Sequence, residues 1–267
     1  MTILGSGSST GTPAIDRGWG RGDPTNPKNR RRRPSLLVEE GRTRLLVDTS
    51  PDLRQQLIAA RVSELSAVLY THAHADHLHG IDDLRAVNRA MGAALDIYAD
   101  RGTLDVIRRR FPYVFEPLDA GADFFYKPVL VPHEVSSGEA FRLGDTEVVA
   151  FEQDHGFGST LGYRFGPVAY STDVVELGEQ AFTLLAGIEL WIIGTLTDTP
   201  HPTHCHVGKA LDWIERLKPK RAVLTHLGLD LDHATLAAEL PPGVEPGFDG
   251  MVIEVPDRDR GGRRVPS

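Results

Sequence analysis

Cysteine is nearly absent from this sequence. Cys205 is the one thiol among 267 residues. A single cysteine cannot form a disulfide within the chain, and it cannot build a cysteine-rich structural zinc site. The sequence therefore excludes the class of small disulfide-stapled domains and favours a reducing compartment. Stability has to come from a hydrophobic core, and a chain of 267 residues is long enough to form one.

Long apolar runs are also missing. No stretch approaches the roughly 18 apolar residues that a transmembrane helix needs. The first residues, MTILGSGSST, have neither the basic start nor the apolar segment of a signal peptide. We therefore predict a cytoplasmic protein without a membrane partner.

Positive charge is in deficit. The chain has 29 Lys and Arg against 37 Asp and Glu, a net charge of −8. This balance argues against nucleic acid as a partner. The one dense basic run is Arg30–Arg33. Such a run is usually a solvated surface, but alternation along an extended segment also allows one arginine to meet a substrate phosphate. Both interpretations stay open.

The glycine-rich stretch GSGSSTGTP follows the short apolar run TIL, yet it lacks the residues of a nucleotide-binding loop. No Gly-Lys-Ser/Thr is present, and the next residues do not have a helical pattern. We predict instead a turn that lets the backbone come close to a site formed elsewhere.

Apolar periodicity predicts a mixed α/β fold. Strand patterns come first, and strands then alternate with helices up to the apolar run GMVIEVP near the end. No linker or solenoid repeat divides the chain, so we predict a single domain over residues 1–267 with a polar tail at about 257–267. A four-layer αββα sandwich accommodates this order, although the alternation alone does not select it over a doubly wound fold.

Histidine is concentrated in one segment, THAHADHLHG at residues 71–80. It follows the buried strand pattern SAVLY. Because side chains alternate along a strand, His72 and His74 are expected to point the same way, with Asp76 and His77 on the turn before a helix near Gly80. Imidazole and carboxylate ligands suit zinc, manganese or iron.

Three further candidates come at the ends of predicted strands: His155 after FEQD, Asp173 after VAYST, and His226 after AVLT. With the first segment they make five imidazoles and two carboxylates. That number of ligands is enough for two ions if one carboxylate bridges them.

The ordered set LLVDTS, THAHADHLHG, His155, Asp173 and LTHLG resembles the five motifs of the metallo-β-lactamase fold hydrolases. The resemblance runs from ILGSGSSTGTP to FDGMVIEV, and it implies the αββα sandwich. Within that superfamily the chain most resembles the PhnP-type phosphodiesterases, which act on phosphoribosyl cyclic phosphate. It is also similar to tRNase Z.

The resemblance implies a role for each site residue. Asp173 bridges two ions, and Asp48 orients the site from behind. Asp76 serves as a ligand and also orients the nucleophile. His204, in HPTHCHVG, matches a histidine that contacts the phosphate or protonates the leaving oxygen, with His206 as the alternative. The remaining ligands divide into two sets: His72, His74 and His155 for one ion, and Asp76, His77 and His226 for the other.

The activity implied is metal-dependent hydrolysis of a small cyclic or diester phosphate, by water activated at two divalent ions, zinc or manganese. The alternatives are a tRNA 3′-end nuclease, a lactone or thioester hydrolase of the same fold, and a metal-binding protein without catalysis. PhnP-type enzymes carry an extra structural zinc on cysteines near the N-terminus. Residues 14–35 contain no cysteine, so we expect no such zinc. The resemblance also suggests a homodimer.

Overall fold

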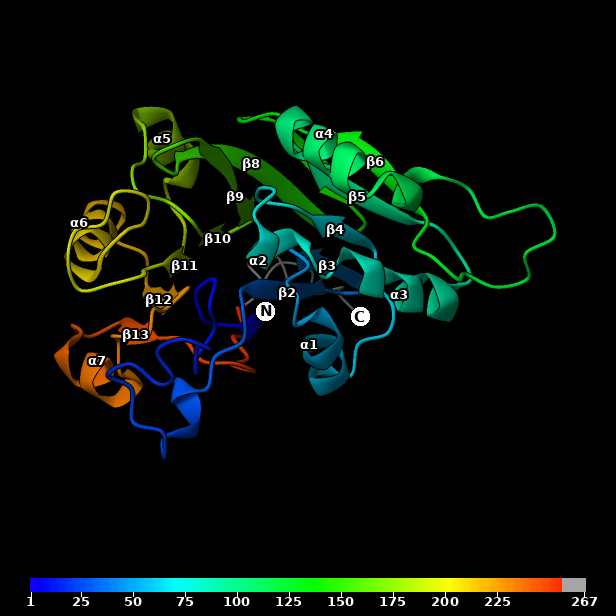
Figure 1. Ribbon diagram of the computed structural model, residues 1–267. Coiled ribbons are helices and arrows are strands. Elements are labelled where there is room, and N and C mark those ends of the chain that lie inside the picture. The colour runs from blue at the N-terminus through cyan, green and yellow to red at the C-terminus, as the bar shows by residue number, and fades with distance from the viewer. Residues whose placement is uncertain (256–267) are drawn as a thin grey trace, which may run out of the picture.

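Two β-sheets form the centre of the molecule in a computed structural model that describes residues 1–255. The predicted polar tail at 257–267 lies outside the described residues. The strands of one sheet follow the order β1-β2-β3-β4-β5-β6, and those of the other β13-β12-β11-β10-β9-β8-β7. Each sheet thus collects consecutive strands, one sheet from each half of the chain (Figure 1).

The first sheet begins as a meander and becomes parallel. Pairing is antiparallel from β1 to β3 and parallel from β3 to β6. Strands β2 and β3 form a hairpin through Gly41, which has φ of 57°. The elements of this half are β1 (Thr2–Gly5), β2 (Ser35–Glu40), β3 (Thr43–Val47), α1 (Leu53–Ala60), β4 (Ala67–Leu69), α2 (Ala75–Leu78), α3 (Leu84–Met91), β5 (Leu95–Ala99), α4 (Arg101–Arg110) and β6 (Leu130–Glu134). Short 3-10 turns lie at Pro27–Asn29, Ile81–Asp83 and Pro112–Phe115.

The second sheet has the same character. Pairing is antiparallel from β7 to β10 and parallel from β10 to β13. Its elements are β7 (Ala140–Leu143), β8 (Thr146–Asp154), β9 (Ser159–Phe165), β10 (Val168–Ser171), α5 (Glu179–Leu185), β11 (Leu190–Gly194), α6 (Val207–Leu217), β12 (Arg221–Thr225), α7 (His233–Glu239) and β13 (Val244–Pro246). A strand such as β11, buried at every position, has to be covered on both faces.

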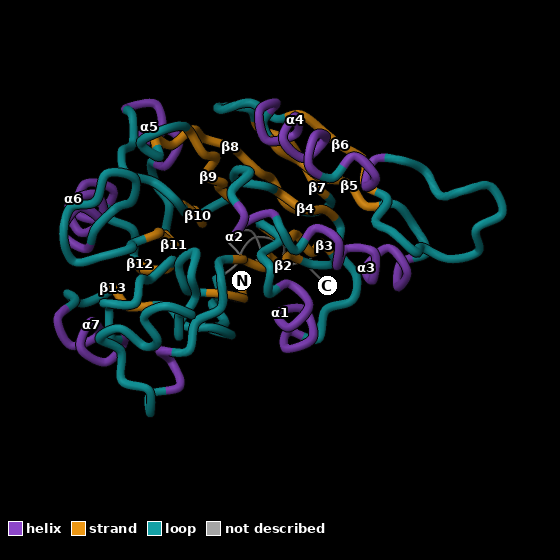
Figure 2. Tube along the Cα trace, viewed as in Figure 1, coloured by secondary structure: helices purple, strands orange, loops and turns teal. Residues whose placement is uncertain are grey.

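Three apolar clusters account for the layers. The central one joins the inner faces of both sheets, with Val38 and Leu45 from the first and Val148 and Ile192 from the second. A second cluster packs α1, α3 and α4 on the outer face of the first sheet, and a third packs α5, α6 and α7 on the second. The strands therefore lie between two helical layers (Figure 2), and the predicted αββα sandwich is confirmed.

The end of the chain differs from the sequence prediction. Among residues 1–255 the last strand is β13, and the described residues 250–255 do not form the strand that the apolar run GMVIEVP suggests. The described part of that segment instead runs beside β1, where the amide of Ile3 donates to Met251 O at 3.0 Å and the amide of Gly250 donates to Ile3 O at 2.7 Å. Val244–Pro246 escaped prediction because three residues ending in proline carry almost no strand pattern.

Within residues 1–255 no helix is long and apolar enough to cross a bilayer. This agrees with the absence of long apolar runs in the sequence.

Candidate metal centre

The histidine-rich segment leaves the first sheet earlier than predicted. Strand β4 ends at Leu69, so the expectation that His72 and His74 share a strand face was wrong. After Leu69 the chain turns towards the second sheet, and Thr71 O accepts the amide of Leu161 on β9 at 2.9 Å. His72 lies in this connection and His74 is the N-cap of α2. Helix α2 begins at Ala75, so Asp76 and His77 lie on a helix and not on a turn before Gly80.

The other candidates do come from strand ends. His155 follows β8 directly, Asp173 lies two residues beyond β10, and His226 follows β12 directly. Asp48, Asp173 and His226 have φ of 63°, 48° and 55°. A left-handed backbone is uncommon outside glycine, and such residues gather at functional sites.

The structure brings the seven predicted ligands together in two groups. Within each group, one ligand atom per residue lies within 4.8 Å of every other. Asp173 belongs to both. The groups are His72, His74, His155 and Asp173, and Asp76, His77, Asp173 and His226. That the groups hold ions stays a proposal, taken up below.

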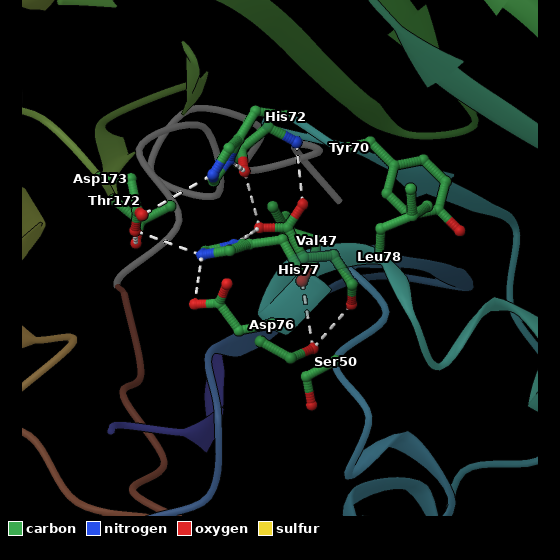
Figure 3. Close-up of polar contacts among 12 residues, drawn as sticks. Val47, Ser50, Tyr70, His72, Asp76, His77, Leu78, Thr172 and Asp173 are labelled. Atoms are coloured by element: carbon green, nitrogen blue, oxygen red, sulfur yellow. Dashed lines mark hydrogen bonds and ion pairs between the residues drawn. The ribbon is translucent and has the colours of Figure 1, made fainter. Parts of the chain in front are cut away.

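The two carboxylate oxygens of Asp173 face different groups. Its Oδ2 lies 3.7 Å from His72 Nε2 and 3.6 Å from His155 Nε2. Its Oδ1 lies 3.2 Å from His77 Nε2 and 3.0 Å from His226 Nε2. Figure 3 shows this carboxylate between His72 and His77, with Asp76 on the far side of His77. This arrangement fits a carboxylate that bridges two cations.

Several buried ligand atoms lack a hydrogen-bond partner. They are His72 Nε2, Asp76 Oδ2, His77 Nε2 and His226 Nε2. An unsatisfied buried polar atom costs about 1–3 kcal/mol. Divalent cations would supply the missing partners, and an imidazole–carboxylate set is the donor chemistry that zinc and manganese accept. The residues present therefore fit a divalent metal centre.

The hydrogen-bond partners of the histidine rings determine which ring nitrogen faces the centre. Asp48, completely buried, accepts Nδ1–H of His77 at 2.6 Å and the Thr71 hydroxyl at 2.8 Å. Having donated its hydrogen to Asp48, the Thr71 hydroxyl accepts Nδ1–H of His72 at 3.0 Å. His155 donates Nδ1–H to Thr203 O at 2.7 Å. In all three rings Nδ1 is engaged away from the centre, so Nε2 is the nitrogen that faces it and offers a lone pair when the ring is neutral.

The two groups differ in their electrostatics. Burial, with His77 as a neighbouring cation, lowers the pKa of His72 well below its ordinary value. Burial also acts to lower the pKa of His77, but Asp173, Asp76 and Asp48 outweigh it, and the net pKa is well above ordinary. The three carboxylates therefore concentrate negative charge around His77, which is an environment that favours a cation.

His204 lies beside the two groups. Its Nδ1 is 4.0 Å from Asp173 Oδ2, and its ring stacks on that of His226 at 5.1 Å between centroids. The ring of His201 also lies close, at 5.2 Å from that of His204 between centroids. His206, the alternative to His204, is the N-cap of α6 and accepts the amide of Lys209. Cys205 is buried, and burial raises the pKa of its thiol to about 12.

A cavity of about 560 Å³ opens beside the two His/Asp groups. Ser9, from the glycine-rich turn, lines it, as expected for a turn that approaches the site. Helix α4 contributes Val106 and Arg110, and the loop after β8 contributes Phe157. Sequence reasoning missed Arg110 and Phe157, because a helical arginine and a loop phenylalanine carry no motif.

None of Arg30–Arg33 is among the residues that line this cavity. Arg31 is buried and donates to the carbonyls of Gly228 and Leu231. Arg33 forms a bidentate pair with Asp52, and Arg30 lies over the ring of Trp19. The open question about this basic run is thus answered by structural roles for these three arginines.

Comparison with known proteins agrees with the fold. A family model described as a β-lactamase superfamily domain matches residues 43–227. The crystal structure of a diphosphatase from the PhnP family superposes with a TM-score of 0.83 and 32% identity, covering 94% of each chain. An octanoyltransferase of Porphyromonas gingivalis is 34% identical over 255 residues, which is 93% of this chain. A ribonuclease Z of Bradyrhizobium sp. (strain ORS 278) is 31% identical over 137 residues, 47% of this chain. The chain spans half of the first curated relative and 45% of the second.

Proposed function

We propose a function from the premise that this chain belongs to the β-lactamase superfamily and, within it, to the PhnP family. Its hydrolase fold and its His/Asp groups fit a metal-dependent hydrolase. The proposed reaction is hydrolysis of a small phosphodiester. The observation that carries it is the position of Asp173, whose two oxygens face two separate sets of histidine nitrogens.

We assign the ligands as the geometry groups them. His72, His74 and His155 would hold one divalent ion, Asp76, His77 and His226 the other, and Asp173 both. When bound, two such ions supply a nucleophile from water at neutral pH and neutralise charge on the phosphate oxygens. Zinc and manganese both suit this ligand set. Asp76 contributes Oδ2 as a ligand, and its other oxygen orients the attacking water.

The cavity supports an anionic substrate over a lactone or thioester. Arg110 lines it, and its guanidinium donates to Ala73 O at 3.0 Å, between the ligands His72 and His74. A fixed guanidinium beside the reacting centre recognises phosphate oxygens. A neutral ester has no group that needs this charge. The PhnP-family relative is itself named a diphosphatase.

The substrate is proposed to be small. The cavity of about 560 Å³ suits a ligand of nucleotide size or less. A tRNA would need a long basic surface, whereas the chain has a net charge of −8. The ribonuclease Z relative matches 47% of the chain. These observations favour a small diester over tRNA.

His204 is proposed to deliver the proton to the leaving oxygen. Burial, followed by the neighbouring His226, lowers the pKa of His204 to about 3, so the ring is neutral before substrate binds. An anionic phosphate in contact with the ring favours its protonated form, so the ring takes up a proton from solvent as the substrate binds. The imidazolium then donates to the departing alkoxide, which is a poor leaving group without that proton.

A parallel activity screen on the purified, metal-loaded protein tests this function. The substrates are an aryl phosphodiester, a ribose cyclic phosphate, a lactone and a precursor tRNA. We expect turnover of the two small phosphodiesters. Rapid lactone turnover without phosphodiesterase activity would overturn the proposal, and selective cleavage of the precursor tRNA would favour the nuclease alternative.

A further inference from the structure

The loop between β8 and β9 holds one phenylalanine out into solvent. Phe157 is 96% exposed, at the tip of a tight turn. Within that turn the amide of His155 donates to Gly158 O at 2.8 Å, and the amide of Phe157 donates to His155 O at 3.0 Å. Gly156 has φ of 81°, and a Cβ there would lie 2.7 Å from Pro202 O. The backbone thus fixes where this ring is presented.

An exposed ring in this place calls for a ligand. Burying a phenylalanine side chain stabilises a folded protein, and the chain forgoes that stabilisation at Phe157. Phe157 also lines the cavity of the metal centre, two residues after the ligand His155. The other fully exposed large apolar side chain, Ile15, is not among the cavity residues. Phe157 is therefore positioned to contact whatever the cavity binds.

The rest of the cavity indicates what kind of group the ring meets. Val106 adds an apolar surface on α4, and Asp100 adds a carboxyl that can accept from a sugar hydroxyl. Hydroxyl-bearing residues line the cavity at Ser9, Thr103, Ser159 and Thr203. A ligand with a phosphate at the ions, a hydroxylated sugar and a flat apolar ring matches these three kinds of lining. Nucleobases stack on aromatic side chains whatever their sequence, because every base has a π-face.

We propose that Phe157 is a specificity-determining residue that stacks on a nucleobase, so that the substrate is a nucleoside-bearing phosphodiester. This rests on the proposed function. In the reaction the oxygen of water bonds to phosphorus, the bond from phosphorus to the ribose oxygen breaks, and that oxygen takes up a proton. The base stays unchanged throughout, so Phe157 acts on binding and not on the bond that breaks.

Two matched ligand pairs test the inference. The products adenosine 3′-monophosphate and methyl ribofuranoside 3-phosphate differ only in the base, and their binding to the metal-loaded protein is measured by calorimetry. The corresponding 2′,3′-cyclic phosphates are compared in hydrolysis, followed by phosphorus NMR. We expect binding and kcat/KM to favour the base-bearing member about 10-fold or more. Phe157→Ala abolishes this preference through binding and KM, with kcat little changed, and Phe157→Trp retains it.

Phe124 provides the control. It is 55% exposed and is not among the cavity residues, so Phe124→Ala should leave both preferences unchanged. Equal binding and turnover of both pair members by the unaltered protein overturns the inference alone, and so does an equal loss of both in Phe157→Ala. A binding preference without turnover of either cyclic phosphate overturns the proposed function and leaves the inference standing. A change of oligomeric state in Phe157→Ala, with the preference intact, shows that a second copy covers the ring and overturns the inference.

Discussion

Single side chains behind the clustered histidines determine which ring nitrogens face the centre. Thr71 donates to Asp48 and accepts from His72, so one carboxylate influences one histidine of each group. Such contacts fix both the tautomer and the orientation of a ligand. None of this follows from sequence, since a threonine beside a histidine motif has no distinctive pattern.

Replacing the bridge and replacing the proton donor should have different consequences. Asp173→Ala and His74→Ala are expected to lose metal and activity together, because each removes a ligand. His204→Ala is expected to retain metal and lose about 10²–10⁴-fold in kcat. Metal analysis beside kinetics separates these cases. An Asp173→Ala protein that is free of metal yet active would contradict the two-ion proposal.

Thr71 offers a finer test of the same centre. Thr71→Val keeps the shape of the side chain and removes the hydroxyl that accepts Nδ1–H of His72. We expect metal affinity to fall about 10- to 100-fold. Thr71→Ser, which keeps the hydroxyl, is the matched control. Competition titration with a chromogenic chelator measures the effect, and equal affinities for the two variants would argue against this role.

At the scale of elements, the sequence predicted the ends of strands better than the path of the segment that carries His72 and His74. The positions of His155, Asp173 and His226 at strand ends were predicted because apolar alternation stops there. The path from Leu69 to Ala75 was not, because it depends on the bond between Thr71 and Leu161 on the other sheet. That bond joins segments 90 positions apart in the chain, which local pattern does not register.

The N-terminal loop is held to the loop after His226 by Arg31. This side chain is 3% exposed, and its guanidinium donates to Gly228 O at 3.0 Å and Leu231 O at 2.6 Å. Burial lowers its pKa to about 10, so it stays charged at neutral pH. Arg31→Met should leave Leu231 O without its donor and Gly228 O with only the amide of Leu231, at 3.3 Å. We expect this to lower the free energy of unfolding by about 1–3 kcal/mol. Urea denaturation measures this, with exposed Arg30→Met as the control expected to change stability by less than about 1 kcal/mol.

The carboxyl of Asp52, at the start of α1, should make a pH-dependent contribution to the stability of the folded state. Burial acts to raise the pKa of Asp52, but the hydrogen bonds from Arg33 outweigh it, and the net pKa is below ordinary. A depressed carboxyl pKa stabilises the folded state above the unfolded pKa of about 3.9, and the stabilisation is lost as the pH falls through the folded value. Asp52→Asn is therefore expected to be less stable than the unaltered protein from pH 7 to about 4, by a constant margin. Denaturation curves should show the difference in stability between the two proteins shrinking below pH 4. A difference that is unchanged at pH 3 would refute the depressed pKa of Asp52.

At the scale of the whole molecule, the site exists only where the two sheets meet. Ligands from residues 72–77 follow the first sheet, and those from 155, 173 and 226 follow the second. The ordered motifs were enough to predict the sandwich and the seven residues that the structure gathers into two groups. They were not enough to predict the cavity walls, because Arg110 and Phe157 come from elements whose approach to the centre depends on tertiary packing. The single domain, the cytoplasmic location and the homodimer stay predictions.

Because both sheets contribute ligands, ion binding and folding should be coupled. Ions bound by the folded chain stabilise it by mass action, since the unfolded chain does not assemble the ligands. Removing the ions with a chelator should also leave buried atoms such as His226 Nε2 without a partner, which destabilises the folded chain. We expect EDTA to lower Tm by about 5–10 °C at neutral pH. Scanning calorimetry tests this, and in Asp173→Ala, which lacks the shared ligand, the same treatment should shift Tm little. An equal shift in both proteins would place the stabilising ions outside this centre.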